Sequence, residues 1–331
     1  MRRREFIGLV PGAAVGWSFE ARAQQTRKLP VIGYLNPGFP VSPSLASSQT
    51  FDNLKVGLRK VGYVDGETVR IEARWGLGKP ETLAGFAEEL VRLKVDVLVA
   101  TARPGIEAAK AATRDIPIAA IDLESDPVAS GYVASLAAPG GNITGLFLDA
   151  PGLTGKWLQQ VREVVPDARK IAVLWDAGTG EYQLRALSAA AKAMSVDLQV
   201  LEFRSAAGME SALVAGLKER PQALIQLGSP LINQLANRIA EISAAHRLPA
   251  ISIFRTFPDG GGLMSYGPVL AAWFQLLGTR YVAAILKGAK AAEVPVYRPD
   301  PFELILNVKA ATAMGATFPS GLLAQANEVI E

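Results

Sequence analysis

The sequence predicts an α/β fold with two Rossmann-like, doubly wound lobes, each built on a parallel sheet. Short apolar runs, typical of buried strands, alternate after residue 30 with stretches of helical period. This pattern also occurs twice, because residues 97–104 and 223–230 both join a buried strand to a short turn and a proline at the first helical position. The repeat indicates two similar lobes that enclose a cleft, joined by a hinge of three crossing segments.

The composition narrows the class of protein. The 331 residues are half apolar and 20% charged, which excludes a disordered or fibrous protein and suits about two domains. The chain has no cysteine, so disulfides, thiolate metal sites and a cysteine nucleophile are excluded. His246 is its one histidine, and the net charge of +3 gives no reason to expect nucleic acid as a partner. We expect neither a metal nor another cofactor.

Residues 1–23 resemble an export signal. Arginines at positions 2–4 precede a mostly apolar stretch, and Ala-Arg-Ala at 21–23 offers the small residues that a signal peptidase recognises. The run Arg-Arg-Glu-Phe-Ile at 3–7 resembles a twin-arginine signal. No cysteine is available for a lipid anchor. We therefore expect a soluble periplasmic protein, with a short membrane anchor as the alternative.

The first half of the chain contains four expected strands and three expected helices. Residues 69–75 alternate between apolar and charged side chains, which suits a strand with one wetter face. Apolar residues recur at helical spacing between Ser48, a candidate N-cap, and Gly62, a candidate C-cap. The expected strands are 31–35, 69–75, 95–100 and 116–121, and the expected helices are the segment between Ser48 and Gly62, residues 81–94, and the segment that Pro104 opens.

In the second half the same alternation resumes after a loop. Residues 135–142, which contain Pro-Gly-Gly-Asn, are interpreted as the neighbourhood of the first crossing between lobes, and the glycine-rich residues 259–262 lead into a return crossing at 263–266. Residues 302–307 form a last strand in the second lobe, before two short helices. The expected strands are 170–175, 197–202, 222–227 and 249–253, and the expected helices are 154–164, 181–194, 208–219, 231–246 and 269–287. The first lobe is then 24–145 plus 268–297, and the second lobe is 146–267 plus 298–331.

Catalytic and nucleotide-binding motifs are weak. Gly178-Thr179-Gly180 follows a strand, but Gln183 stands where a dinucleotide-binding turn has its third glycine. Near a helix end, His246 suits the helix dipole rather than a catalytic triad. Glu124 and Asp126 form a close carboxylate pair after a strand. They suit general acid–base chemistry, a turn that binds a ligand amine or hydroxyl, or, for Asp126, a turn alone.

Polar and aromatic side chains follow the predicted strands, at the edge where α/β sheets bind ligands. Arginine grips a carboxylate, helix N-termini favour anions, and aromatic rings supply stacking area. The expected ligand-binding residues are Asn36, Thr101, Arg103, Glu124, Asp126, Trp175, Asp176, Ser229, Phe254, Arg255 and Tyr266.

Three roles are expected within this set. An acid group of the ligand would be held by Thr101, Arg103 and Ser229. An amine or hydroxyl would be taken by the carboxylates, and an apolar part would be framed by aromatic rings. The carboxylates are Asp126 and Glu124, and the rings are Trp175, Phe254 and Tyr266.

Motifs spread over nearly the whole chain resemble a known family. The export signal, Gly57–Val64, Glu89–Val97, Asp126–Val128, Pro139–Gly145, Gly261–Pro268 and Ile285–Lys290 occur in a specific order. Together they resemble the ABC-transporter substrate-binding protein family that includes tryptophan/tyrosine-type binding proteins. The resemblance implies a type I periplasmic-binding-protein fold, a ligand clamped between two lobes, and partnership with a membrane permease and ATPase.

Two departures from the family pattern concern the ligand. The position of Arg103 is more often small or hydroxylic in the family, and residues 122–125 are more charged than usual. An extra anionic group on the ligand, or a plugged pocket, would follow. We expect a monomeric, non-enzymatic receptor for an amino acid, an aromatic or another carboxylate-bearing solute. The alternatives are an exported enzyme that uses Glu124 and Asp126, and a sensing module for a membrane kinase.

Overall fold

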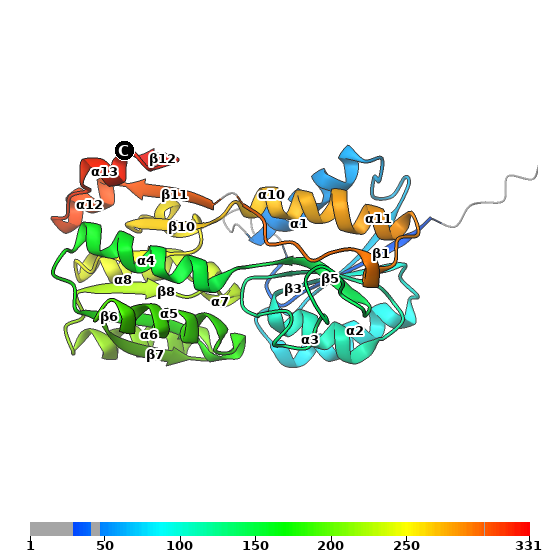
Figure 1. The fold of residues 1–331 in the computed structure, drawn as a ribbon, viewed down its shortest axis with the longest axis horizontal. Helices are drawn as coiled ribbons and strands as arrows, with labels where there is room; N and C mark the ends of the chain where they lie inside the picture. Colours follow the sequence, from blue (N-terminus) through cyan, green and yellow to red (C-terminus); the bar gives the residue numbers. More distant parts are fainter. Residues whose placement is uncertain (1–28, 41–46, 301) are drawn as a thin grey trace, which may run out of the picture.

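The computed structural model describes residues 29–40, 47–300 and 302–331, arranged as two lobes along the long axis (Figure 1). The expected export signal at 1–23 lies outside the described residues. One lobe holds a five-stranded sheet of order β2-β1-β3-β4-β5, and the other holds a seven-stranded sheet of order β12-β11-β10-β9-β8-β6-β7. The prediction of two α/β lobes is confirmed. Within the described residues, no helix is long and apolar enough to cross a membrane.

The first sheet is parallel throughout. Strands β3 and β4 are buried along their whole length, whereas the edge strand β2 is half-buried after its exposed first residue, without the alternation in exposure that its sequence predicts. Helix α1 begins at Ser47, so Ser48 lies in its first turn rather than at its N-cap. Gly62 has the positive φ of a C-capping residue. The strands are β1 (Val31–Asn36), β2 (Arg70–Trp75), β3 (Val97–Thr101), β4 (Ile118–Asp122) and β5 (Ile143–Phe147), and the helices are α1 (Ser47–Lys60), α2 (Leu83–Arg92) and α3 (Ala102–Ala112).

The sequence did not predict β5, and this changes the position of the first crossing. Its first residue, Ile143, pairs with the first residue of β4, so residues 135–142 lie at the amino end of the sheet. They precede the crossing, and strand β5 lies between them and it. The chain leaves the first sheet after Phe147 and enters α4 at Ala150. Gly145 hides the strand pattern, and it is required because a Cβ there would collide with the carbonyl of Ala120.

The second sheet is parallel except between β10 and β11, which are antiparallel. The short edge strand β12 was not predicted. Pro230 is the first residue of α7, as predicted, whereas Pro104 is the third residue of α3. The strands are β6 (Lys170–Asp176), β7 (Asp197–Phe203), β8 (Ala223–Gln226), β9 (Ala250–Ser252), β10 (Met264–Pro268), β11 (Phe302–Asn307) and β12 (Glu328–Ile330), and the helices are α4 (Ala150–Val164), α5 (Tyr182–Ala193), α6 (Ala206–Leu217), α7 (Pro230–Gln234), α8 (Ala236–Ala245), α9 (Thr256–Asp259), α12 (Val308–Met314) and α13 (Ser320–Leu323).

A second segment returns to the first lobe after β10. It forms α10 (Leu270–Leu276), a π-helical turn (Leu277–Val282) and α11 (Ala283–Leu286), which replace the single helix expected at 269–287. It packs on α1, which lies beside it in Figure 1. Tyr297 then pairs with Leu146 in the first lobe before β11 joins the second sheet. The described residues that join the lobes therefore lie at three places: residues 148–149, Val269 and residues 298–300.

Candidate ligand-binding site

A cavity that is partly open to solvent lies between the lobes, and the empty space in it, including its open mouth, is about 650 Å³. Its apolar lining includes three aromatic rings: Phe39 and Phe274 from the first lobe, and Phe254 from the second. The polar lining residues are Asn36, Thr50, Thr101, Glu124, Asn233 and Gln234.

The carboxyl ends of the strands position these side chains. Asn36 ends β1, Thr101 ends β3 and Glu124 follows β4. On the other lobe, Asn233 lies in α7, which follows β8, and Phe254 follows β9. Because the carboxyl ends of parallel strands share one edge of a sheet, residues far apart in sequence meet at the cleft.

Asn36 is held rigidly at the cavity wall. Its side-chain amide donates a hydrogen bond to the Tyr34 hydroxyl at 2.9 Å, and its oxygen accepts one from the Gly38 N–H at 2.7 Å. Tyr34 is fully buried against Phe51 and Trp75, and burial raises the pKa of its hydroxyl. The hydroxyl therefore stays neutral, and the position of Asn36 is fixed by the protein itself.

Glu124 and Asp122 form a buried carboxyl pair at the end of β4. Their exposed fractions are only 3% and 1%. Asp122 accepts a hydrogen bond from the Glu124 N–H at 2.7 Å, and Glu124 accepts one from the Arg103 N–H at 2.7 Å. Burial, followed by repulsion from Asp122, raises the pKa of Glu124 well above its usual range. Glu124 therefore keeps its proton to a higher pH than an exposed glutamate does.

Arg103, expected to grip an acid group, is directed elsewhere. Its guanidinium pairs with Glu107 on the next turn of α3 at 2.8 Å. It also reaches the second lobe, where it lies so close to Gly180 that a Cβ on that glycine would collide with it. The side chain is not part of the cavity lining. Arg103 therefore contributes a contact between lobes beside the cavity.

Ser229, Asp176 and Trp175 make hydrogen bonds within the second lobe. The Ser229 hydroxyl donates to Asp176 at 2.9 Å and accepts from two N–H groups in the first turn of α7. Asp176 also accepts from the Gly178 N–H at 3.0 Å, and burial raises its pKa. Trp175 donates to the Gly180 carbonyl at 2.9 Å. All three lie outside the cavity lining.

Asp126 belongs to the hinge. Its carboxylate accepts hydrogen bonds from the Val128 and Ala129 N–H groups and pairs with Arg298 at 3.1 Å. Arg298 also pairs with Asp149 in the first crossing, at 3.4 Å. The hydrogen bonds of Asp126 agree with a role in a turn. Through its ion pairs, Arg298 also connects two of the three crossings.

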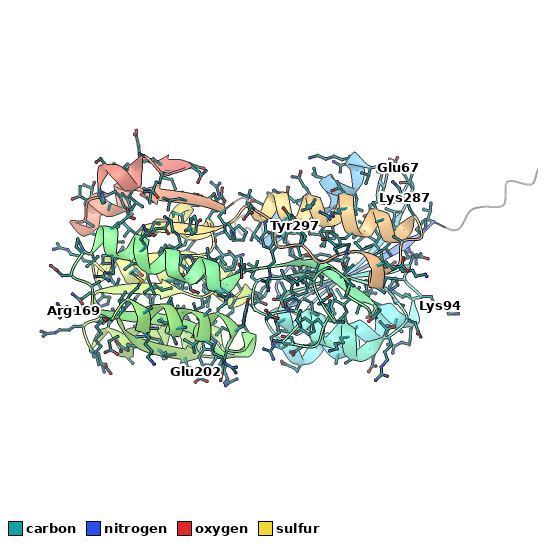
Figure 2. All side chains as sticks on the ribbon, in the orientation of Figure 1. Glu67, Lys94, Arg169, Glu202, Lys287 and Tyr297 are labelled. Atoms are coloured by element: carbon teal, nitrogen blue, oxygen red, sulfur yellow. The ribbon has the colours of Figure 1, made fainter. Side chains whose placement is uncertain are left out.

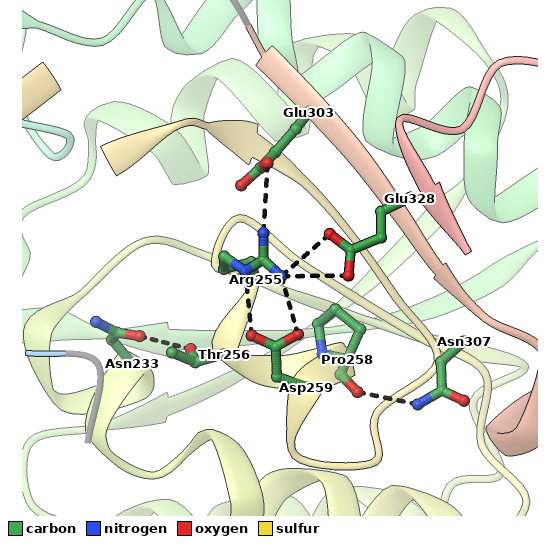
Figure 3. Close-up of polar contacts among 8 residues, drawn as sticks. All are labelled: Asn233, Arg255, Thr256, Pro258, Asp259, Glu303, Asn307 and Glu328. Carbon is green, nitrogen blue, oxygen red and sulfur yellow. Dashed lines mark hydrogen bonds and ion pairs between the residues drawn. The ribbon is translucent and has the colours of Figure 1, made fainter. Parts of the chain in front are cut away.

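Arg255 is surrounded by three carboxylates, as Figure 3 shows. It pairs with Asp259 at 3.1 Å, Glu328 at 3.2 Å and Glu303 at 3.7 Å. These contacts tie α9 to strands β11 and β12. Tyr266 stacks on Phe302, with ring centroids 5.8 Å apart, and also lies outside the cavity lining.

Four of the eleven expected residues therefore line the cavity: Asn36, Thr101, Glu124 and Phe254. Others on the lining were missed, including Phe39, Asn233, Gln234 and Phe274. Phe39 lies in the loop that follows Asn36 at the end of the first strand, so its position in the sequence could have indicated that it lines the cavity. Phe274 lies on an apolar helix, where nothing local distinguishes a cavity residue from a core residue.

Gln183, noted only as a departure from a glycine motif, connects the lobes. Its side-chain amide donates to the Leu123 carbonyl of the first lobe at 2.6 Å, and its oxygen accepts from the Gly228 N–H at 2.7 Å. It is 4% exposed. The two lobes are thus in direct hydrogen-bonded contact beside Glu124.

Charged side chains lie on the outer surfaces of both lobes. Figure 2 shows Arg169 and Glu202 on the outside of the second lobe, and Lys94 and Lys287 at the far end of the first. In the part of the chain that the structure describes, no cluster of three or more His, Cys, Asp or Glu side chains suits a metal ion. The cavity lining combines apolar side chains with six polar residues, of which only Glu124 is ionisable.

Two α/β lobes, three crossings and a cavity lined from both sides define a bilobed binding protein. The chain belongs to the ABC transporter substrate binding protein family, whose model matches residues 42–330. It is 26% identical over 282 residues to the tyrosine-binding protein of Clostridioides difficile (strain R20291), covering 82% of this chain and 79% of the relative.

Solved structures share the fold. A domain from Streptococcus pneumoniae in complex with L-Trp superposes with a TM-score of 0.83 at 23% identity, over 91% of this chain and all of the other. A conserved domain protein from Vibrio cholerae gives 0.83 at 24% identity, with the same coverage. A ligand-free, open substrate binding protein from Clostridium difficile gives 0.64 at 24% identity, over 91% and 99% of the two chains.

Proposed function

We propose that this protein is the solute receptor of an ABC importer and that it binds a small organic ligand between its lobes. The observation that carries the proposal is the cavity, because Phe39 and Glu124 line it from one lobe and Phe254 and Asn233 from the other. A ligand there contacts both lobes at once. Membership of the substrate-binding family supports the same function.

Ligand contact is proposed for Asn36, Thr101, Glu124 and Phe254, together with the rings of Phe39 and Phe274. Three aromatic rings around one cavity suit a ligand with an aromatic or other flat apolar part. The relatives agree with this choice, since one is named for tyrosine and one structure contains L-Trp.

Ligand binding would act through the hinge. A ligand that contacts both lobes favours the closed form over the open form. The shift in this equilibrium is set by the difference between the ligand's binding free energies for the closed and the open form. The permease would recognise the closed form. In this proposal the signal at 1–23 directs a monomer to the periplasm, where it serves a permease and ATPase without altering its ligand.

The enzymatic alternative depends on Glu124 and Asp126 acting together. Asp126 is paired with Arg298, and the carboxyl neighbour of Glu124 is Asp122. The geometry therefore favours binding over acid–base chemistry by that pair. A sensor for a membrane kinase would use the same cavity.

The proposal is tested on the refolded chain 24–331 by calorimetric titration with aromatic solutes, followed by mass spectrometry of the recovered ligand. Phe254→Ala should weaken binding at least tenfold, because it removes one wall of the cavity. Phe86→Ala, on the outer helix α2, is the matched control and should leave the affinity unchanged. Conversion of the ligand, or equal effects of the two variants, would contradict the proposal.

A further inference from the structure

We infer that the polar group this cavity selects is a cationic amine, and that a ligand carboxylate is disfavoured. The inference rests on the proposed function and names its ligand class: an apolar, aromatic amine. It departs from the expectation of a carboxylate-bearing solute. Three features of the site support it.

The first feature is the charge on the cavity lining. Among the described lining residues Glu124 is the one ionisable side chain, and no Lys, Arg or His is present. Residues 41–46, which the structure does not describe, contain no charged residue in the sequence. The nearby Arg103 and Arg255 are paired with protein carboxylates. A ligand carboxylate would therefore meet no cation.

The second feature is the state of the helix N-termini. Helix α3 begins at the cavity, and its Arg103 N–H donates to Glu124 at 2.7 Å. The first turn of α7 donates to the Ser229 hydroxyl at 3.1 and 3.0 Å. Helix N-termini are where an anionic ligand group gains most from backbone donors. At α3 and α7, side chains of the protein already accept hydrogen bonds from backbone N–H groups of the first turn.

The third feature is the buried carboxyl pair of Asp122 and Glu124. Asp122 Oδ2 is buried and accepts no hydrogen bond from any described residue. Asp122 and Glu124 are each at least 97% buried, which makes an unpaired negative charge costly. An ammonium group beside Glu124 would favour the ionised form of this carboxyl against the cost of burial, whereas a ligand carboxylate would oppose its ionisation. Nearby rings such as Phe39 and Phe254 suit a cation attached to an apolar body.

The test uses three compounds that share one ring: tyramine, tyrosine and 3-(4-hydroxyphenyl)propanoate, titrated calorimetrically into the ligand-free chain 24–331. An indole series (tryptamine, tryptophan and indole-3-propanoate) repeats the comparison. We expect the amine to bind at least tenfold more tightly than the amino acid, and the acid to bind least. Glu124→Gln should weaken amine binding at least tenfold, with the exposed Glu88→Gln as control.

The wild-type comparison needs no variant, so it remains decisive if Glu124→Gln fails to fold. Tighter binding of the acid or the amino acid than of the amine would overturn the inference and leave the receptor function standing. Failure of every amine to bind to folded protein would also overturn it. The receptor function is judged separately by the Phe254→Ala experiment.

Discussion

The side-chain amide of Gln183 in α5 donates a hydrogen bond to the carbonyl of Leu123 at 2.6 Å, although the two residues lie in different lobes. Leu123 precedes Glu124 and lines the cavity. The bond therefore forms when the lobes meet beside the proposed ligand. Its loss should change the equilibrium between open and closed forms without removing a residue from the cavity lining.

Gln183→Met should lower ligand affinity roughly five- to tenfold, since one buried hydrogen bond contributes about 1 kcal/mol. Titration calorimetry measures the affinity, and small-angle X-ray scattering of the ligand-free protein should report a larger radius of gyration. Gln159→Met, on an exposed part of α4, is the control. Unchanged affinity and scattering would show that this contact does not hold the lobes together.

Stability should depend on pH through Glu124. Because its pKa is raised in the folded state, the folded protein keeps a proton that the unfolded chain loses. The free energy of unfolding should therefore fall as pH rises from the ordinary pKa of glutamate toward the raised value. Asp122 and Asp176 add to this shift, while the Arg103 N–H opposes it.

Glu124→Gln removes the titrating group. Urea denaturation between pH 5 and pH 8, a range above the ordinary pKa of a carboxyl, should therefore show that the free energy of unfolding falls less steeply with pH in the variant. Toward pH 8, the free energy of unfolding of the variant should rise relative to that of the wild type. Parallel curves for the two proteins would mean that Glu124 titrates normally.

Close packing of α1 on α10 requires a glycine at position 57. A Cβ there would collide with the backbone of Gln275. Gly57→Ala should therefore lower the free energy of unfolding by roughly 1–3 kcal/mol, the usual cost of overpacking. Gly85→Ala, in α2 with nothing within 4 Å, should instead raise it by up to about 1 kcal/mol. The same sign for both variants would contradict this account of the helix contact.

Arg255 should matter for stability and not for binding. Arg255→Met removes its pairs with Asp259, Glu303 and Glu328 (Figure 3). Because the side chain is partly exposed, the expected loss is about 1 kcal/mol, and it should shrink at high salt. Urea denaturation at two salt concentrations measures it, with Arg204→Met as the exposed control. A tenfold loss of ligand affinity would instead place Arg255 in the site.

Periodicity was enough to predict the lobes, because buried parallel strands and amphipathic helices have distinct apolar patterns. It missed β5, where Gly145 interrupts the apolar run, and β12, which has three residues. The predicted strand ends located one edge of the cavity, where Asn36 and Glu124 lie. Proximity to a strand end did not reveal which side chains already had partners. Ser229 and Asp126 are used in caps and turns, which only the tertiary structure shows.

The most direct test of the account is a crystal structure of the chain 24–331 with the tightest-binding aromatic compound. The account predicts the compound between the lobes, with its ring against Phe254 and its polar group within hydrogen-bond distance of Glu124. A compound bound outside this cavity, or held there by Arg103 through a carboxylate, would contradict it.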